Sequence, residues 1–160
     1  MEKKDIYNFL NEKGINYEVM EHKAVFNMEE AFELNLPHPE SEAKNLFVID
    51  KKKNYYFITV KGDKKINLKD FKLKNKIKSI SFASEKDLLN ILNLIPGAVS
   101  PLGLLNDKDL KVKYYIDKEF TGDNLIGVHP NDNTATIWLK VEDLIKIIKE
   151  HGNEVKQFET

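Results

Sequence analysis

Residues 96–107 read PGAVSPLGLLND, and this stretch separates a helical pattern before it from a strand pattern after it. The helical pattern begins at Ser84, which is placed as an N-cap for the backbone N–H of Asp87. Pro96 fixes its own φ and Gly97 tolerates a positive φ, so the pair predicts a turn. Such a loop either connects a helix to a strand and does nothing more, or leaves backbone N–H groups free to bind a carbonyl oxygen or an anion.

Hydrophobic periodicity divides the rest of the chain into short elements. Helical patterns are found at residues 5–13, 27–34 (with Asn27 as N-cap), 67–71, 84–94 and 141–150. Strand patterns are found at residues 15–19, 44–50, 55–60, 77–83, 111–117, 124–129 and 134–139. The two kinds do not alternate regularly, which favours an α+β fold with a mixed, largely antiparallel sheet over a doubly wound one. We expect one compact domain over residues 1–160.

Composition excludes several classes of protein. The chain has no cysteine, so it has no disulfide, no thiolate metal site and no cysteine nucleophile. It has no apolar run long enough to span a bilayer, and its first residues form a mixed-charge amphipathic stretch with no signal-peptide pattern. We therefore expect a cytoplasmic protein that has no membrane partner.

Positive charge is concentrated in the middle of the chain. Residues 44–78 contain 12 Lys against 3 acidic residues, whereas the segments on either side are acidic. A basic section can bind a polyanion such as RNA. However, all 25 basic residues are Lys, so a compositional preference for Lys explains the pattern equally well, and there is no Arg to clamp phosphate with two hydrogen bonds.

Few side chains indicate chemistry by themselves. The four histidines show no metal-binding spacing, and no nucleotide-binding or nucleophile-elbow motif is present. Ser100 could act as a nucleophile only with His129 as its base, or His129 could be structural. Lys44 begins an apolar strand, where its ammonium could enter a cleft or simply be solvated. Asn45 beside it offers a donor and an acceptor.

An ordered set of short stretches resembles one family. The stretches are KNLF (44–47), SFAS (81–84), GAVSP (97–101), ND (106–107), HP (129–130) and NTAT (133–136). Together they resemble the YbaK/ProX family, the stand-alone relatives of the bacterial prolyl-tRNA synthetase editing domain. The branch that they resemble most closely is that of the alanyl-tRNA(Pro) deacylases, called ProXp-ala or PrdX. The resemblance covers almost the whole chain.

The resemblance implies a fold, a reaction and a catalytic site. The implied fold is a mixed sheet or barrel-like core with surrounding helices. The implied reaction is hydrolysis of the ester that joins a wrong amino acid to tRNA(Pro), sparing Pro-tRNA(Pro), without a metal or other cofactor. Lys44 matches the family's essential lysine and residues 97–101 match its GxxxP loop. The implied catalytic groups are therefore Lys44 and the backbone of Gly97, Ala98, Val99 and Ser100.

The resemblance also implies the groups that bind the substrate. Asn45 and His129 would orient it, and Asp117 is a less secure match to a family aspartate. We expect the wall of the pocket to include Val99 or Leu102 beside the loop, with Phe26 and Asn27, and Pro101 is a further candidate for binding the substrate. His22-Lys23 and Asn27 depart from the residues found in many relatives, which leaves the amino-acid specificity open.

Partners and alternatives follow from the same resemblance. We expect tRNA(Pro) that carries a non-cognate amino acid as the substrate, a transient contact with prolyl-tRNA synthetase, and no DNA partner. One alternative is a deacylase for Cys-tRNA(Pro) or for another small residue. The other is a non-catalytic regulator that binds an aminoacyl-tRNA or an amino acid. An intact loop beside Lys44 favours catalysis, because a sensor does not need an oxyanion site.

Overall fold

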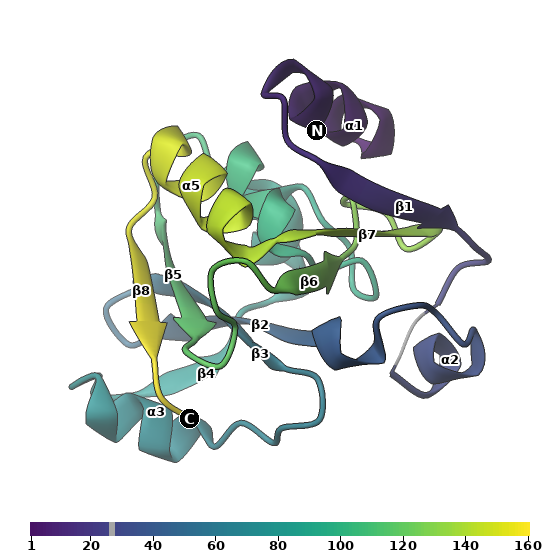
Figure 1. The fold of residues 1–160 in the computed structure, drawn as a ribbon. Helices are drawn as coiled ribbons and strands as arrows, with labels where there is room; N and C mark the ends of the chain where they lie inside the picture. Colours follow the sequence, from purple (N-terminus) through teal and green to yellow (C-terminus); the bar gives the residue numbers. More distant parts are fainter. Residues whose placement is uncertain (26–27) are drawn as a thin grey trace.

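The computed structural model describes residues 1–25 and 28–160 and contains two open β-sheets flanked by helices (Figure 1). The smaller sheet has the strand order β1 (Tyr17–Glu21), β7 (Ala135–Lys140), β6 (Leu125–Val128). The larger sheet has the order β4 (Ile80–Phe82), β2 (Ala43–Asp50), β3 (Tyr55–Lys61), β5 (Val112–Asp117), β8 (Val155–Phe158). The α+β class predicted from the sequence is confirmed.

Strand pairing is mostly antiparallel, as expected. β7 pairs antiparallel with β1 and β6, and β2 does so with β3 and β4, whereas β5 pairs parallel with β3 and β8. The expected barrel-like core is not found in the described part of the chain. β2 and β6 lie in contact, but no ladder of hydrogen bonds joins them, so each sheet keeps two edge strands.

The helices are short and lie around both sheets. They are α1 (Lys3–Glu12), α2 (Met28–Glu33), α3 (Leu68–Lys74), α4 (Glu85–Asp87) and α5 (Val141–His151), with 3₁₀-helices at Pro39–Ser41 and Pro101–Asn106 and a π-helical turn at Leu88–Leu92. The Ser84 hydroxyl accepts the N–H of Asp87, so the predicted N-cap is confirmed. The predicted N-cap Asn27 lies outside the described residues.

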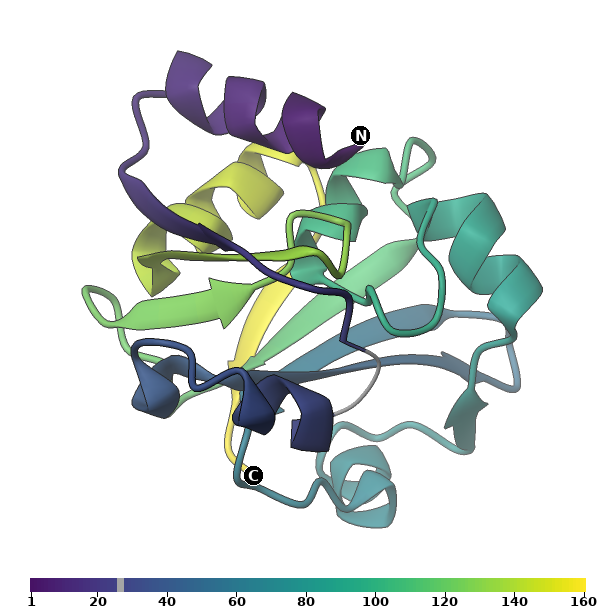
Figure 2. The same ribbon diagram turned by 90° about the vertical axis from the view of Figure 1, so that its right-hand side faces the viewer.

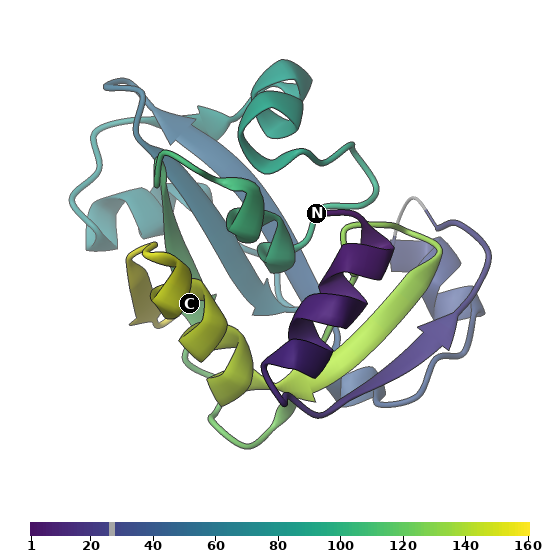
Figure 3. The same cartoon turned by 90° about the horizontal axis from the view of Figure 1, so that it is seen from above.

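Alternation along the central strands gives the larger sheet two buried faces. Tyr114 and Ile116 of β5 face the main core, which α1 and α5 also fill, whereas Tyr115 between them faces a second cluster with Phe71 of α3. Figure 2 shows α1 and α3 at opposite ends of the molecule with the larger sheet between them, and Figure 3 shows α1 lying across the smaller sheet. Both cores are apolar, which accounts for most of the stability of such a domain.

Several elements differ from the expectation. β1 lies two residues later than predicted, and the predicted helix at 84–94 becomes α4 followed by the π-helical turn, which ends at Asn93 with a left-handed φ of 55°. The 3₁₀-helix Pro101–Asn106 was not predicted. Strand β8 was not predicted either, because a four-residue edge strand that pairs only with β5 has little periodicity to detect. No helix in the described part of the chain is long and apolar enough to span a membrane.

Candidate active site

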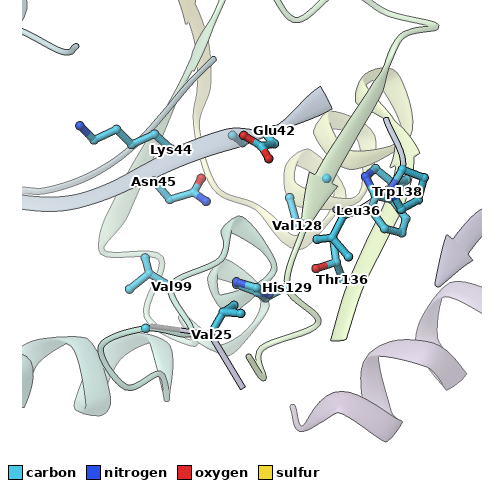
Figure 4. Close-up of a pocket in the computed structure, with 14 residues that line it drawn as sticks. Val25, Leu36, Glu42, Lys44, Asn45, Val99, Val128, His129, Thr136 and Trp138 are labelled. Atoms are coloured by element: carbon cyan, nitrogen blue, oxygen red, sulfur yellow. The ribbon is translucent and has the colours of Figure 1, made fainter. Parts of the chain in front are cut away.

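A cavity of about 290 Å³ opens between the two sheets. It is lined by the first residues of β2, by β6 and β7, by the loop after Pro96, and by segments before α2 and after it. Figure 4 shows side chains from these separate segments pointing toward a shared space. Five of the predicted site residues line this cavity, namely Lys44, Asn45, Gly97, Val99 and His129.

Neighbouring positions on β2 send Lys44 and Asn45 to opposite faces. Side chains along a strand point alternately to its two faces. Asn45 therefore lies on the same face as Phe47 of the main core, whereas Lys44 lies on the same face as Leu46, which packs against the second cluster. In Figure 4 Asn45 points toward His129, whereas the Lys44 side chain extends away from it. Asn45 is therefore the residue inside the cavity, and the Lys44 ammonium lies at its margin.

The loop after Pro96 offers backbone donors to the cavity. The predicted turn at Pro96 and Gly97 is confirmed, and Gly97 has a φ of 91°, which a glycine tolerates. The N–H of Ala98 donates to the Ile95 carbonyl at 3.1 Å and is not free. Among the described residues, the N–H groups of Gly97, Val99 and Ser100 have no acceptor. The expected set of oxyanion donors therefore loses Ala98.

Ser100 holds this loop in place through its side chain. The residue is completely buried, and its hydroxyl donates to the His129 carbonyl oxygen at 2.6 Å and accepts the N–H of Leu102 at 3.2 Å. Its proton is therefore directed to the backbone of His129 and not to the imidazole. The alternative in which Ser100 is a nucleophile activated by His129 is not supported, and the bond instead ties the loop to the chain after β6.

The structure does not place Asp117, a predicted substrate contact, at the cavity. Asp117 is only 1% exposed and does not line the cavity. Its carboxylate accepts the N–H groups of Lys61 and Glu119 and forms a 2.9 Å ion pair with Lys64. A buried carboxylate needs such partners, so Asp117 has a structural role at the end of β5.

Of the residues predicted to form the wall or bind the substrate beside the loop, Val99 lines the cavity. Pro101 and Leu102 are buried beneath the loop and do not line the cavity. Phe26 and Asn27 lie outside the described residues. The observed apolar wall also contains Val25, Leu36, Gly127 and Trp138, which were not among the predicted site residues.

Close packing makes part of this wall rigid. A Cβ atom at Gly127 would lie 2.8 Å from Nε1 of Trp138, so the indole packs directly against bare backbone. Val25 is held in place by Asn133, whose Nδ2 donates to the Val25 carbonyl at 2.9 Å. A glycine inside a strand pattern signals a close approach, and Gly127 carried that signal in the sequence.

His129 presents a hydrogen-bond acceptor to the cavity. Its Nδ1 lies 2.9 Å from the Ala135 carbonyl, which can only accept, so Nδ1 carries the proton and Nε2 carries a lone pair when the ring is neutral. Burial lowers the pKa of His129 below its ordinary value of 6.5, and the neighbouring His22 lowers it further. The neutral tautomer is therefore the main form at neutral pH.

Because Nε2 of His129 accepts only when the ring is neutral, we expect the rate of the reaction in the cavity to fall at acid pH, which gives its pH profile an acid limb. Protonation of Nε2 would replace the acceptor by a donor and add a positive charge, so single-turnover activity should fall as the pH drops through a value below 6.5. A His129→Gln variant should lack this limb, whereas a His22→Asn variant should keep it. The same limb in His129→Gln would show that another group titrates.

Metal ligands do not gather at the cavity. In the part of the chain that the structure describes, no three His, Asp or Glu side chains come together as a metal site would require. Beside the backbone of the loop, the polar side chains that line the cavity are those of Lys44, Asn45, Glu42, His129 and Thr136. Burial raises the pKa of the Glu42 carboxyl above its ordinary value.

Comparison with known proteins agrees with this picture. Residues 22–147 match the family model described as the aminoacyl-tRNA editing domain. The prolyl-tRNA editing protein ProX of Acetoanaerobium sticklandii is 42% identical over 94% of this chain and 92% of its own length. Prolyl-tRNA synthetase associated domain-containing protein 1 of Mus musculus is 37% identical over 88% of this chain and 86% of its own length.

Solved structures share the fold. A proposed trans-editing enzyme for prolyl tRNA synthetase superimposes with a TM-score of 0.72, covering 99% of this chain and 96% of the other at 16% identity. At that identity the likeness concerns the fold alone, and the sequence matches carry the assignment. The chain therefore belongs to the YbaK/ProX family of aminoacyl-tRNA editing domains.

Proposed function

We propose that this chain is a trans-editing hydrolase that deacylates Ala-tRNA(Pro) and spares Pro-tRNA(Pro). Family membership supports aminoacyl-tRNA deacylation, and the names of its relatives support tRNA(Pro) as the carrier. The observation that carries the proposal is that one cavity brings two kinds of group together. It is lined by Gly97 and Val99, whose N–H groups have no acceptor among the described residues, and by Asn45 and His129.

The reaction needs no protein nucleophile, because an aminoacyl ester is already activated. Water attacks the ester carbonyl, a new C–O bond forms, and the bond to the ribose oxygen breaks as that oxygen takes up a proton. The negative charge that develops on the carbonyl oxygen requires donors held in place beforehand. The N–H groups of Gly97 and Val99 supply them, and the ribose hydroxyl that remains free helps to position the water.

Asn45 and His129 orient the substrate in this scheme. Nε2 of His129 accepts a hydrogen bond from the α-ammonium or from a ribose hydroxyl, since both are donors. The Lys44 ammonium, at the margin of the cavity, binds the phosphate of the terminal adenosine. Its direction in Figure 4 favours this role over stabilisation of charge at the carbonyl.

The acceptor stem of the tRNA has a candidate surface in the basic section. Lys51, Lys52 and Lys53 of the β2–β3 turn are exposed, as are Lys69 and Lys74 of α3. Exposed ammonium groups contact phosphates without reading sequence, and their contribution falls with salt. A transient contact with prolyl-tRNA synthetase belongs to the same proposal, supported by the name of the mouse relative.

Selectivity against proline follows from the size of the pocket. The wall is close-packed where Trp138 lies against Gly127, and the backbone of Val25 is fixed by its hydrogen bond from Asn133. A close-packed wall excludes a larger side chain because it has little room to move. The pyrrolidine ring is bulkier than the methyl group of alanine. Discrimination against a smaller residue such as glycine would be weak, roughly 1–3 kcal/mol per methylene.

One assay tests the whole proposal. Purified protein is mixed with radiolabelled Ala-, Cys-, Ser- and Pro-tRNA(Pro), and with Ala-tRNA(Ala) to separate recognition of the amino acid from recognition of the tRNA. We expect Ala-tRNA(Pro) to be hydrolysed at least 100-fold faster than Pro-tRNA(Pro), about 2.7 kcal/mol in barrier height. Faster hydrolysis of Cys-tRNA(Pro) would make cysteine the substrate. Equal rates on Ala and Pro would overturn size exclusion, and no hydrolysis at all would favour a regulator.

A further inference from the structure

A buried chain of hydrogen bonds runs through the larger sheet to the cavity. The Tyr114 hydroxyl donates to Oγ1 of Thr59 at 2.9 Å, and the Thr59 hydroxyl donates to Oδ1 of Asn45 at 2.7 Å. The three residues lie on the neighbouring strands β5, β3 and β2. Tyr114 and Thr59 are completely buried, and only Asn45 reaches the cavity.

The direction of this chain is set at its buried end. Within the described residues, the Tyr114 hydroxyl has no partner other than Thr59, so its proton must go there or remain unpaired in an apolar core. Thr59 has a single proton, and once its oxygen accepts from Tyr114 that proton goes to Asn45. The group of Asn45 that receives it must be the carbonyl oxygen, because the amide nitrogen accepts nothing.

We infer that Tyr114 and Thr59 are positioning residues that hold the Asn45 amide with Nδ2 toward the cavity. This inference rests on the proposed function, for which it supplies a fixed donor. In Figure 4 the Asn45 amide faces the space between Val99 and His129. A donor there binds an oxygen of the aminoacyl ester, whereas the reversed amide would present Oδ1 and repel that oxygen. The hydrogen bonds from Tyr114 and Thr59 thus determine that the substrate contacts Nδ2 of Asn45 and not Oδ1.

Variants can remove this chain without opening a hole in the core. Thr59→Val keeps the shape of the side chain and deletes the hydroxyl, but it leaves the Tyr114 hydroxyl buried and unpaired. The double variant Thr59→Val/Tyr114→Phe deletes both hydroxyls, so only Oδ1 of Asn45 loses its partner. Thr59→Ser keeps the hydroxyl and serves as the matched control. Thermal melting verifies that each variant is folded.

The first readout is the Asn45 amide itself, observed by NMR in labelled protein. Its side-chain resonances are identified as the set that disappears in Asn45→Ala. We expect the double variant to shift the Asn45 carbonyl carbon and to broaden or split the amide signals, and Thr59→Ser to leave them near their wild-type positions. Unchanged resonances in the folded double variant would overturn the inference. This readout decides the inference even if the protein hydrolyses no aminoacyl-tRNA.

The second readout is single-turnover deacylation in a double-mutant cycle. The double variant should lose about tenfold in rate in the wild-type background and nothing further in the Asn45→Ala background, because the hydroxyls act only through Asn45. Thr59→Ser should keep most of the wild-type rate. Equal losses in both backgrounds would mean that Thr59 and Tyr114 support the fold in general and do not position Asn45.

Discussion

Replacing Lys44 by methionine is expected to lower single-turnover deacylation of Ala-tRNA(Pro) by about 10- to 100-fold while leaving the fold intact. A hydrogen bond to a charged group is worth about 1.5–3 kcal/mol, which corresponds to this range. Lys44 has no hydrogen bond or ion pair with any described residue, so its loss leaves no buried group unpaired. Methionine retains most of the aliphatic stem, and the thermal midpoint should therefore change little.

The matched control is Lys146→Met on α5. Lys146 is exposed, lies outside the basic section and does not line the cavity, so this variant removes the same charge away from the proposed tRNA surface. It should keep a rate within a few-fold of wild type at moderate salt. The Lys44→Met defect should appear mainly as weaker substrate binding and should shrink as salt rises, because salt already weakens the phosphate contact. A Lys44→Met rate close to that of Lys146→Met would remove Lys44 from the site.

The strands that carry the site were predictable because their side chains alternate. Residues 44–50 and 55–60 read as a hairpin, and the structure pairs Lys44 with Val60 and Ile49 with Tyr55 in one register. The hairpin sets the position of Asn45 relative to Thr59, and local pattern is sufficient to find it. Strand β8 was not predicted because it pairs only with β5, which is distant from it in the sequence.

The wall of the cavity was not predictable in the same way. Val25, Leu36, Gly127 and Trp138 come from four separate segments, and no pattern within any one segment shows that they meet. Val25 reaches the cavity because its N–H group donates to the Asn133 carbonyl, in the segment before β7. Such long-range pairing is a property of the folded chain and has no local signature.

Two polar residues that the sequence offered as candidates have structural partners for a common physical reason. Ser100 and Asp117 are polar residues near the ends of elements, where functional groups often occur. Both are buried, and a buried polar group must be satisfied by the protein itself. Ser100 is satisfied by His129 and Leu102, and Asp117 by Lys61, Lys64 and Glu119. Burial, which the sequence does not report for isolated polar residues, decides between the two roles.

Replacing Gly97 by alanine is expected to lower the rate of hydrolysis by about 10²–10³, the usual effect of losing one oxyanion donor. Gly97 has a φ of 91°, a conformation that a residue with a Cβ adopts only under strain of roughly 1–3 kcal/mol. The loop can relieve that strain by rotating the peptide groups on either side of the residue. Such a rotation moves the N–H groups of Gly97 and Val99 away from the carbonyl oxygen they serve.

Gly14→Ala is the control that separates strain from chemistry. Gly14 also has a positive φ, 68°, and an added Cβ there would meet no atom within 4 Å. It lies just beyond α1 and does not line the cavity, so its variant should lose stability but hydrolyse Ala-tRNA(Pro) at the wild-type rate. Gly97→Ala should melt at a similarly lowered temperature, lose the rate, and still bind a non-hydrolysable aminoacyl-tRNA analogue almost normally. If binding and turnover fall together, the loop shapes the pocket and its N–H groups do not stabilise the oxyanion, because an interaction made only in the transition state cannot weaken the ground-state complex.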